Sequence, residues 1–247
     1  MNEMIYLYDG SFHGFLCCIF ESYTRREIPS AVLGPAEGQI TLFGTEAIAT
    51  DPTHARRVAN GLTRLGPMGR ERVMTGFLST EEEKDLILLR FARRCFDEGP
   101  RAVQMLGDPD VHAAFVLERN VNNEVCRFIE FIRFEEKDGM LGSVIHPKNN
   151  VLPLLRGHFC SRLPDEDFLI FDAAHGTALL RQSGHVQYLA MEHYEPARDA
   201  DELNWQALWK RFFHALTIEE RRNAKAQMNH APKRFWGGMV EMREPYI

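Results

Sequence analysis

Residues 168–190, FLIFDAAHGTALLRQSGHVQYLA, carry the clearest strand pattern in this chain. Residues 168–173, 177–182 and 185–190 within this stretch are predicted strands, because apolar side chains recur in each run and polar or glycine-containing links separate the runs. The link Ser183-Gly184 has the length and composition of a tight turn between neighbouring strands. The stretch therefore predicts a meander of three strands.

A hairpin and a helix are predicted just before the meander. Residues 129–136 and 140–146 have extended character, and Asp138-Gly139 between them is a strong hairpin signal. Residues 151–163 are a predicted helix, capped by Asn149 or Asn150 and with Pro in its first turn. With the meander, these segments predict a mainly antiparallel sheet in the order hairpin–helix–meander.

Helices are predicted on both sides of this sheet-forming region. Residues 201–214 and 217–230 are helical, and Thr217-x-x-Glu220 matches a capping box. Residues 111–128 carry an apolar stripe at spacings of three and four residues: Ala114, Leu117, Val121, Val125 and Phe128. Residues 110–247 are therefore predicted to form an α+β domain whose sheet is packed by C-terminal helices.

The N-terminal part, residues 1–99, is predicted to be mainly helical after a short first strand. The strand spans residues 4–8, and Ser11 is placed to cap a helix that runs to about residue 23. The elements expected next are a strand at 40–43 and helices at 51–65 (capped by Asp51), 70–78 and 80–98. Residues 99–110 hold two Pro and two Gly, so this segment is the predicted boundary between the two parts.

The charge of the chain is unevenly distributed. The net charge is −6, yet residues 205–243 hold eight Lys or Arg against three Glu, a balance of +5 that leaves −11 for the remainder. All three tryptophans lie in the same stretch. Because cations neutralise phosphates and flat rings stack on unpaired bases, the stretch predicts contact with DNA that is single-stranded or distorted. The alternative is that the rings fill a core while the charges occupy solvated helix faces.

Eight side chains of this stretch are the candidate nucleic-acid ligands. Arg, Asn and Gln pair with phosphates and base edges, Lys neutralises phosphates, and Trp stacks on bases. The same residue types are also ordinary on a helix surface, and no helix-turn-helix or zinc-finger pattern accompanies them. The candidates are Arg221, Arg222, Asn223, Lys225, Gln227, Lys233, Arg234 and Trp236.

A second set of polar residues predicts an enzyme site at the junction of sheet and helices. In this hypothesis Asp172 or Glu124 is the base, His158 transfers the proton, and arginines hold phosphate. The structural alternatives are a helix-surface ion pair for Glu124, a core-edge histidine for His158 and a turn cap for Asp172. The full set is Glu124, Arg127, Arg133, His158, Arg162 and Asp172.

Metal, cofactor and membrane sites receive little support from the sequence. A metal site formed by His158, Asp172 and His175 is an alternative, but no ligand spacing identifies it. The five cysteines are scattered and form no Cys-x-x-Cys pair, which predicts reduced thiols, a cytoplasmic protein and no cofactor bound by this chain. No run of about 18 apolar residues is present, which argues against a membrane span.

Several short motifs lie in a fixed order along the chain. They are Tyr8-Asp-Gly-Ser-Phe, Arg119…Glu124-x-x-Arg127…Phe131-x-Arg133-Phe134, His158-Phe159…Arg162, Phe171-Asp172, Arg221-x-Asn223…Gln227 and Pro232…Trp236…Glu241. Together they resemble a bacterial family described as DNA metabolism or repair proteins, including its domain of unknown function, from residue 4 to about residue 241. The resemblance implies a link to DNA repair, because members of that family are encoded beside a radical S-adenosylmethionine protein. In longer relatives the domain is fused to a uracil-DNA-glycosylase-like domain.

Two functions follow as expectations. The first is an accessory protein of DNA repair or modification that binds nucleic acid through residues 205–243 and acts with a radical S-adenosylmethionine partner. An iron–sulfur cluster and S-adenosylmethionine would then belong to the partner. The alternative is an enzyme acting on nucleic acid, hydrolytic or glycosylase-like, that uses the six polar residues. A structural scaffold without DNA contact is a third interpretation.

Overall fold

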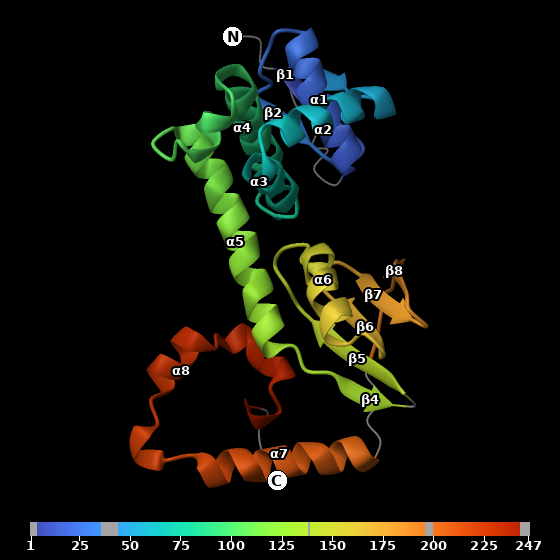
Figure 1. Ribbon diagram of the computed structural model, residues 1–247, viewed down its shortest axis with the longest axis vertical. Helices are drawn as coiled ribbons and strands as arrows, with labels where there is room; N and C mark the ends of the chain where they lie inside the picture. The colour runs from blue at the N-terminus through green and yellow to red at the C-terminus, as the bar shows by residue number, and fades with distance from the viewer. Residues whose placement is uncertain (1–3, 36–43, 138, 196–199, 243–247) are drawn as a thin grey trace. The chain divides into compact units, whose positions relative to one another are not determined.

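The computed structural model describes residues 4–35, 44–137, 139–195 and 200–242, and the chain forms two compact units, Met1–Asn122 and Asn123–Ile247 (Figure 1). Both units contain helices and strands, so the predicted α+β class is confirmed. The division falls within the long helix α5 (Pro109–Phe131). The predicted boundary segment 99–110 instead forms the 3-10 helix η2 (Pro100–Gln104) and the start of α5, because Ala102 and Val103 are buried in the core of the first unit.

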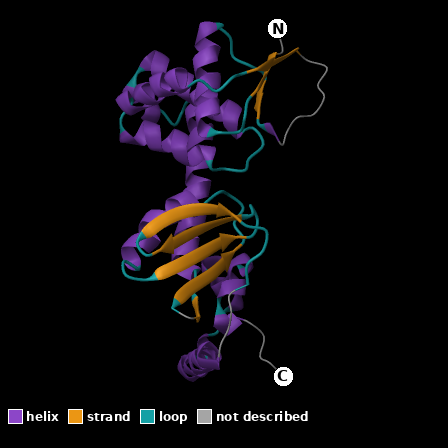
Figure 2. Cartoon of the chain, turned by 90° about the vertical axis from the view of Figure 1, so that its right-hand side faces the viewer, coloured by secondary structure: helices purple, strands orange, loops and turns teal. Residues whose placement is uncertain are grey.

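The second unit is built on a five-stranded sheet in the order β4-β5-β6-β7-β8 (Figure 2). Ser183 and Gly184, with φ of 49° and 79°, turn the chain between β7 and β8, and these positive values suit the twist of a hairpin. The sheet is mixed, since β5 and β6 pair in parallel while the other neighbours are antiparallel. The strands are β4 (Glu135–Lys137), β5 (Met140–Ile145), β6 (Asp167–Asp172), β7 (Thr177–Gln182) and β8 (His185–Ala190).

The parallel pairing arises from helix α6 (Leu152–Arg162), which connects β5 to β6. A parallel pair needs a crossover of this kind, whereas a short turn produces an antiparallel pair. Phe134 packs between the helix and the sheet, with its ring 5.4 Å from Phe159 of α6 and 6.0 Å from Phe168 of β6. No side chain caps α6 at its N-cap position, Val151, so the predicted Asn cap is wrong.

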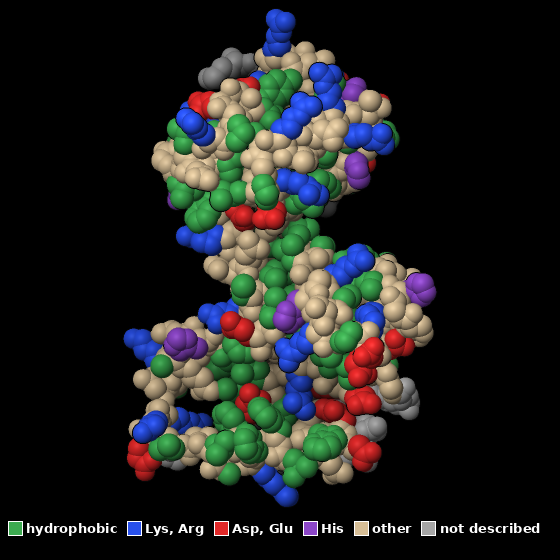
Figure 3. Space-filling view, in the orientation of Figure 1, with side chains coloured by type: hydrophobic (Ala, Val, Ile, Leu, Met, Phe, Trp, Pro, Cys, Tyr) green, Lys and Arg blue, Asp and Glu red, His purple; other side chains and the backbone are tan. Residues whose placement is uncertain are grey.

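The C-terminal arm, residues 200–242, contains the two predicted α-helices, but the second begins at Ala224 and not at residue 217. Thr217 Oγ1 donates to the carbonyl of Phe213 at 2.7 Å instead of forming the capping box, and Asn223 Oδ1 accepts from Ala226 N at 3.0 Å to cap the next helix. Space-filling Figure 3 shows hydrophobic side chains gathered along the first of these helices. The arm comprises α7 (Ala200–Leu216), η3 (Glu219–Arg221), α8 (Ala224–His230), η4 (Lys233–Gly238) and η5 (Val240–Met242).

The first unit contains a parallel sheet, β2-β1-β3, that the sequence did not predict beyond its first strand. The predicted strand at 40–43 lies outside the described residues. Ser11 and Asp51 cap α1 and α2 as predicted, accepting from Gly14 N at 2.9 Å and Thr53 N at 2.6 Å. The elements are β1 (Met4–Leu7), α1 (Phe12–Thr24), β2 (Ala31–Leu33), β3 (Gly44–Ala47), α2 (Pro52–Arg64), α3 (Pro67–Phe77) and α4 (Lys84–Glu98).

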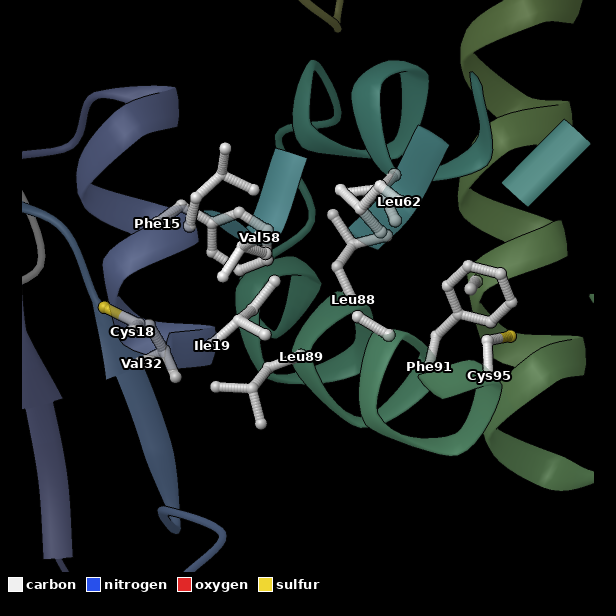
Figure 4. Packing of buried hydrophobic residues seen from close by; sticks show 14 of the residues in the cluster. Phe15, Cys18, Ile19, Val32, Val58, Leu62, Leu88, Leu89, Phe91 and Cys95 are labelled. Atoms are coloured by element: carbon white, nitrogen blue, oxygen red, sulfur yellow. The ribbon is translucent and has the colours of Figure 1, made fainter. Parts of the chain in front are cut away.

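The core of the first unit is formed by apolar faces of its helices. Phe15 and Ile19 of α1 lie with Leu88 and Leu89 of α4, and all four side chains are fully buried (Figure 4). The predicted stripe of α5 is buried at every position: Ala114, Leu117, Val121, Val125 and Phe128. The helix continues to Phe131, past residue 129, where the sequence predicted a strand.

Candidate nucleic-acid interface

Glu124 of α5 is buried, with 2% of its surface exposed, and its carboxylate holds the loop between β5 and α6. Oε1 accepts from the backbone N of Lys148 at 2.9 Å, and Oε2 accepts from the backbone N and Nδ2 of Asn149 at 2.9 and 2.7 Å. Arg234 Nη1 lies 3.3 Å from Oε1. Because both oxygens are directed at the chain itself, the geometry indicates a structural role for Glu124.

A cavity of about 410 Å³, which we call the sheet cavity, lies beside the sheet of the second unit. Arg133, His146 and Arg234 contribute polar groups to its lining, and Phe171 contributes an aromatic ring. Arg133 Nη2 lies 3.4 Å from Glu202 Oε1, while Arg133 Nε is buried without a hydrogen-bond partner. The cavity therefore combines apolar walls with an incompletely paired guanidinium.

The six residues of the predicted enzyme site, all of them described, do not meet in this cavity, and Arg133 is the member that lines it. Arg127 Nη1 donates to the carbonyl of His230 at 2.8 Å and to Glu130 at 3.0 Å, which attaches the arm to α5. Arg162 is exposed at the end of α6. His158 Nε2 is buried without a partner, with its ring edge-on to that of the neighbouring phenylalanine.

Asp172, 1% exposed at the end of β6, is bonded within its own turn. Oδ1 accepts from the backbone N of Ala174 and of His175 at 3.0 and 3.1 Å, and Oδ2 lies 2.7 Å from His175 Nδ1. This geometry is that of a turn cap. Within residues 4–35, 44–137, 139–195 and 200–242, no three His, Cys, Asp or Glu side chains are grouped to hold a metal ion.

Most of the nucleic-acid candidates do gather, around a cavity of about 800 Å³ that we call the C-terminal hollow. Lys210 and Phe213 of α7 also line it, and Lys and Arg side chains border the opening in the arm (Figure 3). Among the described lining residues, Glu241 carries the one acidic side chain, and its carboxylate accepts from Trp209 Nε1 at 2.8 Å. The candidates in the lining are Arg221, Arg222, Asn223, Gln227 and Trp236.

Two of these candidates already serve the fold of the arm. Asn223 Oδ1 is occupied by the cap of α8, and Gln227 Nε2 lies 3.5 Å from Met242 Sδ. Their amides are therefore less suited to reading base edges than the sequence suggests. Arg221 and Arg222 are exposed on the turn that leads into α8, where guanidinium groups are accessible to a phosphate.

The other three candidates lie outside the lining of the C-terminal hollow. Lys225 is exposed on α8. Lys233 Nζ lies 5.8 Å from the centre of the Trp236 ring, within the range of a cation–π contact. Arg234 turns to Glu124 and to the sheet cavity. Lys233 therefore lies beside a lining residue of the C-terminal hollow, whereas Arg234 belongs to the sheet cavity.

The aromatic residues of the arm also divide. Phe235 is buried and packs on Phe128 of α5, with ring centres 5.0 Å apart, as the core alternative expects. Trp205 and Trp209 are instead 66% and 41% exposed. Trp236 is half-buried in the hollow, and its Nε1 donates to a backbone carbonyl at 2.7 Å.

Lys210 and Phe213 line the hollow but are not among the residues predicted from the sequence. Both lie in the basic, aromatic stretch, and their spacing of three residues places them on one face of α7. That spacing could have identified the two residues as members of one surface. It carries no information that residues 221–236 lie opposite them across the hollow.

A family model described as a domain of unknown function (DUF4130) matches residues 82–241, and the chain belongs to this family. The matched region runs from α4 to η5 and contains the residues of both cavities. No curated protein and no solved structure matches the chain. Among the described residues, no helix has the length and apolarity that crossing a membrane requires.

Proposed function

We propose that this protein binds single-stranded or distorted DNA through the C-terminal hollow. The observation that carries the proposal is that Lys210, Arg221 and Arg222 line one concave surface together with Phe213 and Trp236. The net charge of −6 opposes a general attraction to nucleic acid, so binding depends on this local concentration of positive charge.

Each component of the hollow has its own role in the proposal. The arginines bind phosphate through paired N–H groups, and Lys210 adds a point charge. The ring of Trp236 offers a face on which a base stacks, worth about 1–3 kcal/mol per base. Because bases within a duplex are stacked on each other, this combination favours an unpaired strand.

Fluorescence anisotropy of a labelled single-stranded oligonucleotide over a series of salt concentrations tests the proposal. Three phosphate contacts on a single strand give a slope of about −2 for the logarithm of the association constant against that of salt, at roughly 0.7 per contact. The double variant Arg221→Ala/Arg222→Ala is expected to reduce the slope to about −0.7 and to weaken binding at low salt. A duplex of the same sequence is expected to bind more weakly.

A matched control separates local from general electrostatics. Arg56→Ala/Arg90→Ala removes the same charge from exposed positions on α2 and α4 and should leave binding unchanged. Binding that survives intact in Arg221→Ala/Arg222→Ala contradicts the proposal. So does an equal loss in both double variants, because general attraction would then account for it.

We further propose that the protein acts in DNA repair or modification as a cytoplasmic accessory to a radical S-adenosylmethionine protein. The support is the ordered set of motifs from Tyr8 to Glu241, since the matched family model assigns no function. The partner would carry the iron–sulfur cluster and S-adenosylmethionine. We expect this chain to co-elute with the radical S-adenosylmethionine protein encoded beside a family member, with iron–sulfur absorbance in the shared peak. Separate elution would contradict the partnership.

A further inference from the structure

Helix α7 exposes a continuous apolar stripe to solvent. The exposed fractions are 66% for Trp205, 52% for Leu208, 41% for Trp209, 54% for Phe212 and 64% for Leu216. The successive spacings of 3, 1, 3 and 4 residues place these side chains along one face of the helix. We call this surface the α7 stripe; it is visible along α7 in Figure 3.

Apart from Trp209, whose Nε1 donates to Glu241 of η5, the stripe is distinct from the face by which α7 attaches to its unit. Glu202 and Gln206 are the buried residues of the helix, and Gln206 Nε2 donates to Glu202 Oε1 at 2.8 Å. Arg133 approaches the same carboxylate at 3.4 Å. The helix is thus held through polar contacts while its largest apolar side chains remain in water. Exposed apolar patches of this kind mark surfaces that bind another molecule.

We propose that the α7 stripe binds the α7 stripe of a second copy of this chain, with the two helices antiparallel. The spacing is self-complementary in that arrangement: when Trp205 of one copy faces Leu216 of the other, Trp209 faces Phe212 by the same register. A twofold axis then passes between residues 210 and 211. Trp205 and Trp209 thus meet Leu216 and Phe212, and Leu208 lies beside these pairs, as in other isologous helix contacts.

The exposed area is sufficient for such a dimer. Aromatic side chains bury about 150–250 Å² each, so the exposed fractions of the five residues amount to roughly 500 Å² per copy. Two copies would bury about 1,000 Å² in total, near the lower limit of a specific interface. The expected dimer therefore dissociates on dilution.

The direction of the partner follows from the register of the stripe and not from charge at its ends. Asp201, exposed one turn before Trp205, lies at the N-terminal end of the helix. The C-terminal end is followed by two acidic and two basic residues, Glu219, Glu220, Arg221 and Arg222, which balance each other. The proposal is independent of DNA binding.

Sedimentation velocity of the full chain over a dilution series tests the proposal. A shift from twice the chain mass of 28.4 kDa to that mass on dilution is the expected result. Phe212→Glu and Leu208→Glu should be monomeric at concentrations where the natural chain is dimeric. Leu106→Glu, at a 44% exposed position of the first unit, is the control and should dimerise normally. Far-UV circular dichroism verifies that each variant is folded.

Cysteine cross-linking tests the register separately. In a background in which the exposed Cys126 is replaced by Ser, equal amounts of Trp209→Cys and Phe212→Cys chains should form mixed disulfides faster than either chain alone forms its own. A chain that is monomeric at every concentration overturns the proposal, as does a dimer that Phe212→Glu leaves intact. Preferential self-pairing of each cysteine variant also overturns it, since that result indicates parallel helices. A monomer whose exposed tryptophans are covered only by lipid vesicles or by another protein assigns the stripe to a different occupant.

Discussion

Replacement of Glu124 by Ala should destabilise the second unit by several kcal/mol. The substitution removes the acceptor for three donors: the backbone N of Lys148, and the backbone N and Nδ2 of Asn149. Asn149 is only 6% exposed, so water cannot replace the lost acceptor for its two donors. A buried unsatisfied donor costs about 1–3 kcal/mol, so the two donors of Asn149 together give about 2–6 kcal/mol. The backbone N of Lys148, an exposed residue, adds about 1 kcal/mol at most.

Glu124→Gln should have a smaller effect. Gln keeps one carbonyl oxygen but presents an NH₂ group in place of the second oxygen, so either Lys148 or Asn149 loses its acceptor. The expected cost is about 1–2 kcal/mol. Glu130→Ala is the control on the same helix, because its side chain is 52% exposed and its ion pair with Arg127 is worth at most about 0.5 kcal/mol.

Hydrogen exchange at the amides of residues 148 and 149 is the appropriate measurement, because a chain with two units need not unfold in one step. A local destabilisation of about 3 kcal/mol accelerates exchange by roughly two orders of magnitude, at 1.4 kcal/mol for each factor of ten. If these amides exchange no faster in Glu124→Ala than in Glu130→Ala, the prediction is wrong. That result would show that the loop is held by something other than this carboxylate.

Three further changes test the packing and electrostatics of both units. Gly76→Ala places a Cβ 2.7 Å from Cδ2 of the buried Leu88, so overpacking of about 1–3 kcal/mol should outweigh the roughly 1 kcal/mol gain in helix propensity and lower the melting temperature. Gly157→Ala in α6 meets nothing within 4 Å and should raise the melting temperature, by up to about 1 kcal/mol in stability; a decrease would contradict this. Hydrogen bonds from Ser11 lower the pKa of Asp9 below its usual 3.8, so its stabilising contribution is present above that pH and is lost as the pH falls through the folded-state pKa. Asp9→Asn should therefore be less stable at neutral pH and lose less stability on acidification in melts across this range, and an unchanged pH profile would contradict the assignment.

Features determined within a few residues could be predicted from the sequence. Ser11 and Asp51 cap helices because their side chains reach amides two or three residues ahead. Ser183-Gly184 specifies a tight turn by its own backbone preferences. In each case the interacting groups are close in sequence, so the signal is complete in the local pattern.

Features that depend on distant partners were missed or misread. The parallel pairing of β5 with β6 and the whole β2-β1-β3 sheet depend on where crossovers place the strands, which no local pattern specifies. Glu124 was expected to pair with Arg127, three residues away, but its hydrogen bonds are to Asn149, 25 residues further on. The second helix of the arm begins after Asn223 and not at Thr217. Asn223 Oδ1 caps it, whereas Thr217 Oγ1 donates to the carbonyl of Phe213. The candidate enzyme residues, chosen by local pattern, accordingly lie at separate places in the fold.

The two surfaces assigned to the C-terminal arm meet at Leu216, which belongs to both, but their other residues lie on different faces of α7. Lys210 and Phe213 line the C-terminal hollow, whereas Trp205 and Phe212 belong to the exposed stripe. Substitutions on one face should therefore leave the other function intact: Phe212→Glu should abolish self-association while preserving the salt slope of DNA binding. If Phe212→Glu removed both, the aromatic stripe and the basic hollow would form one continuous surface. The local excess of positive charge in the sequence would then mark the whole C-terminal arm as the binding surface, and not the C-terminal hollow alone.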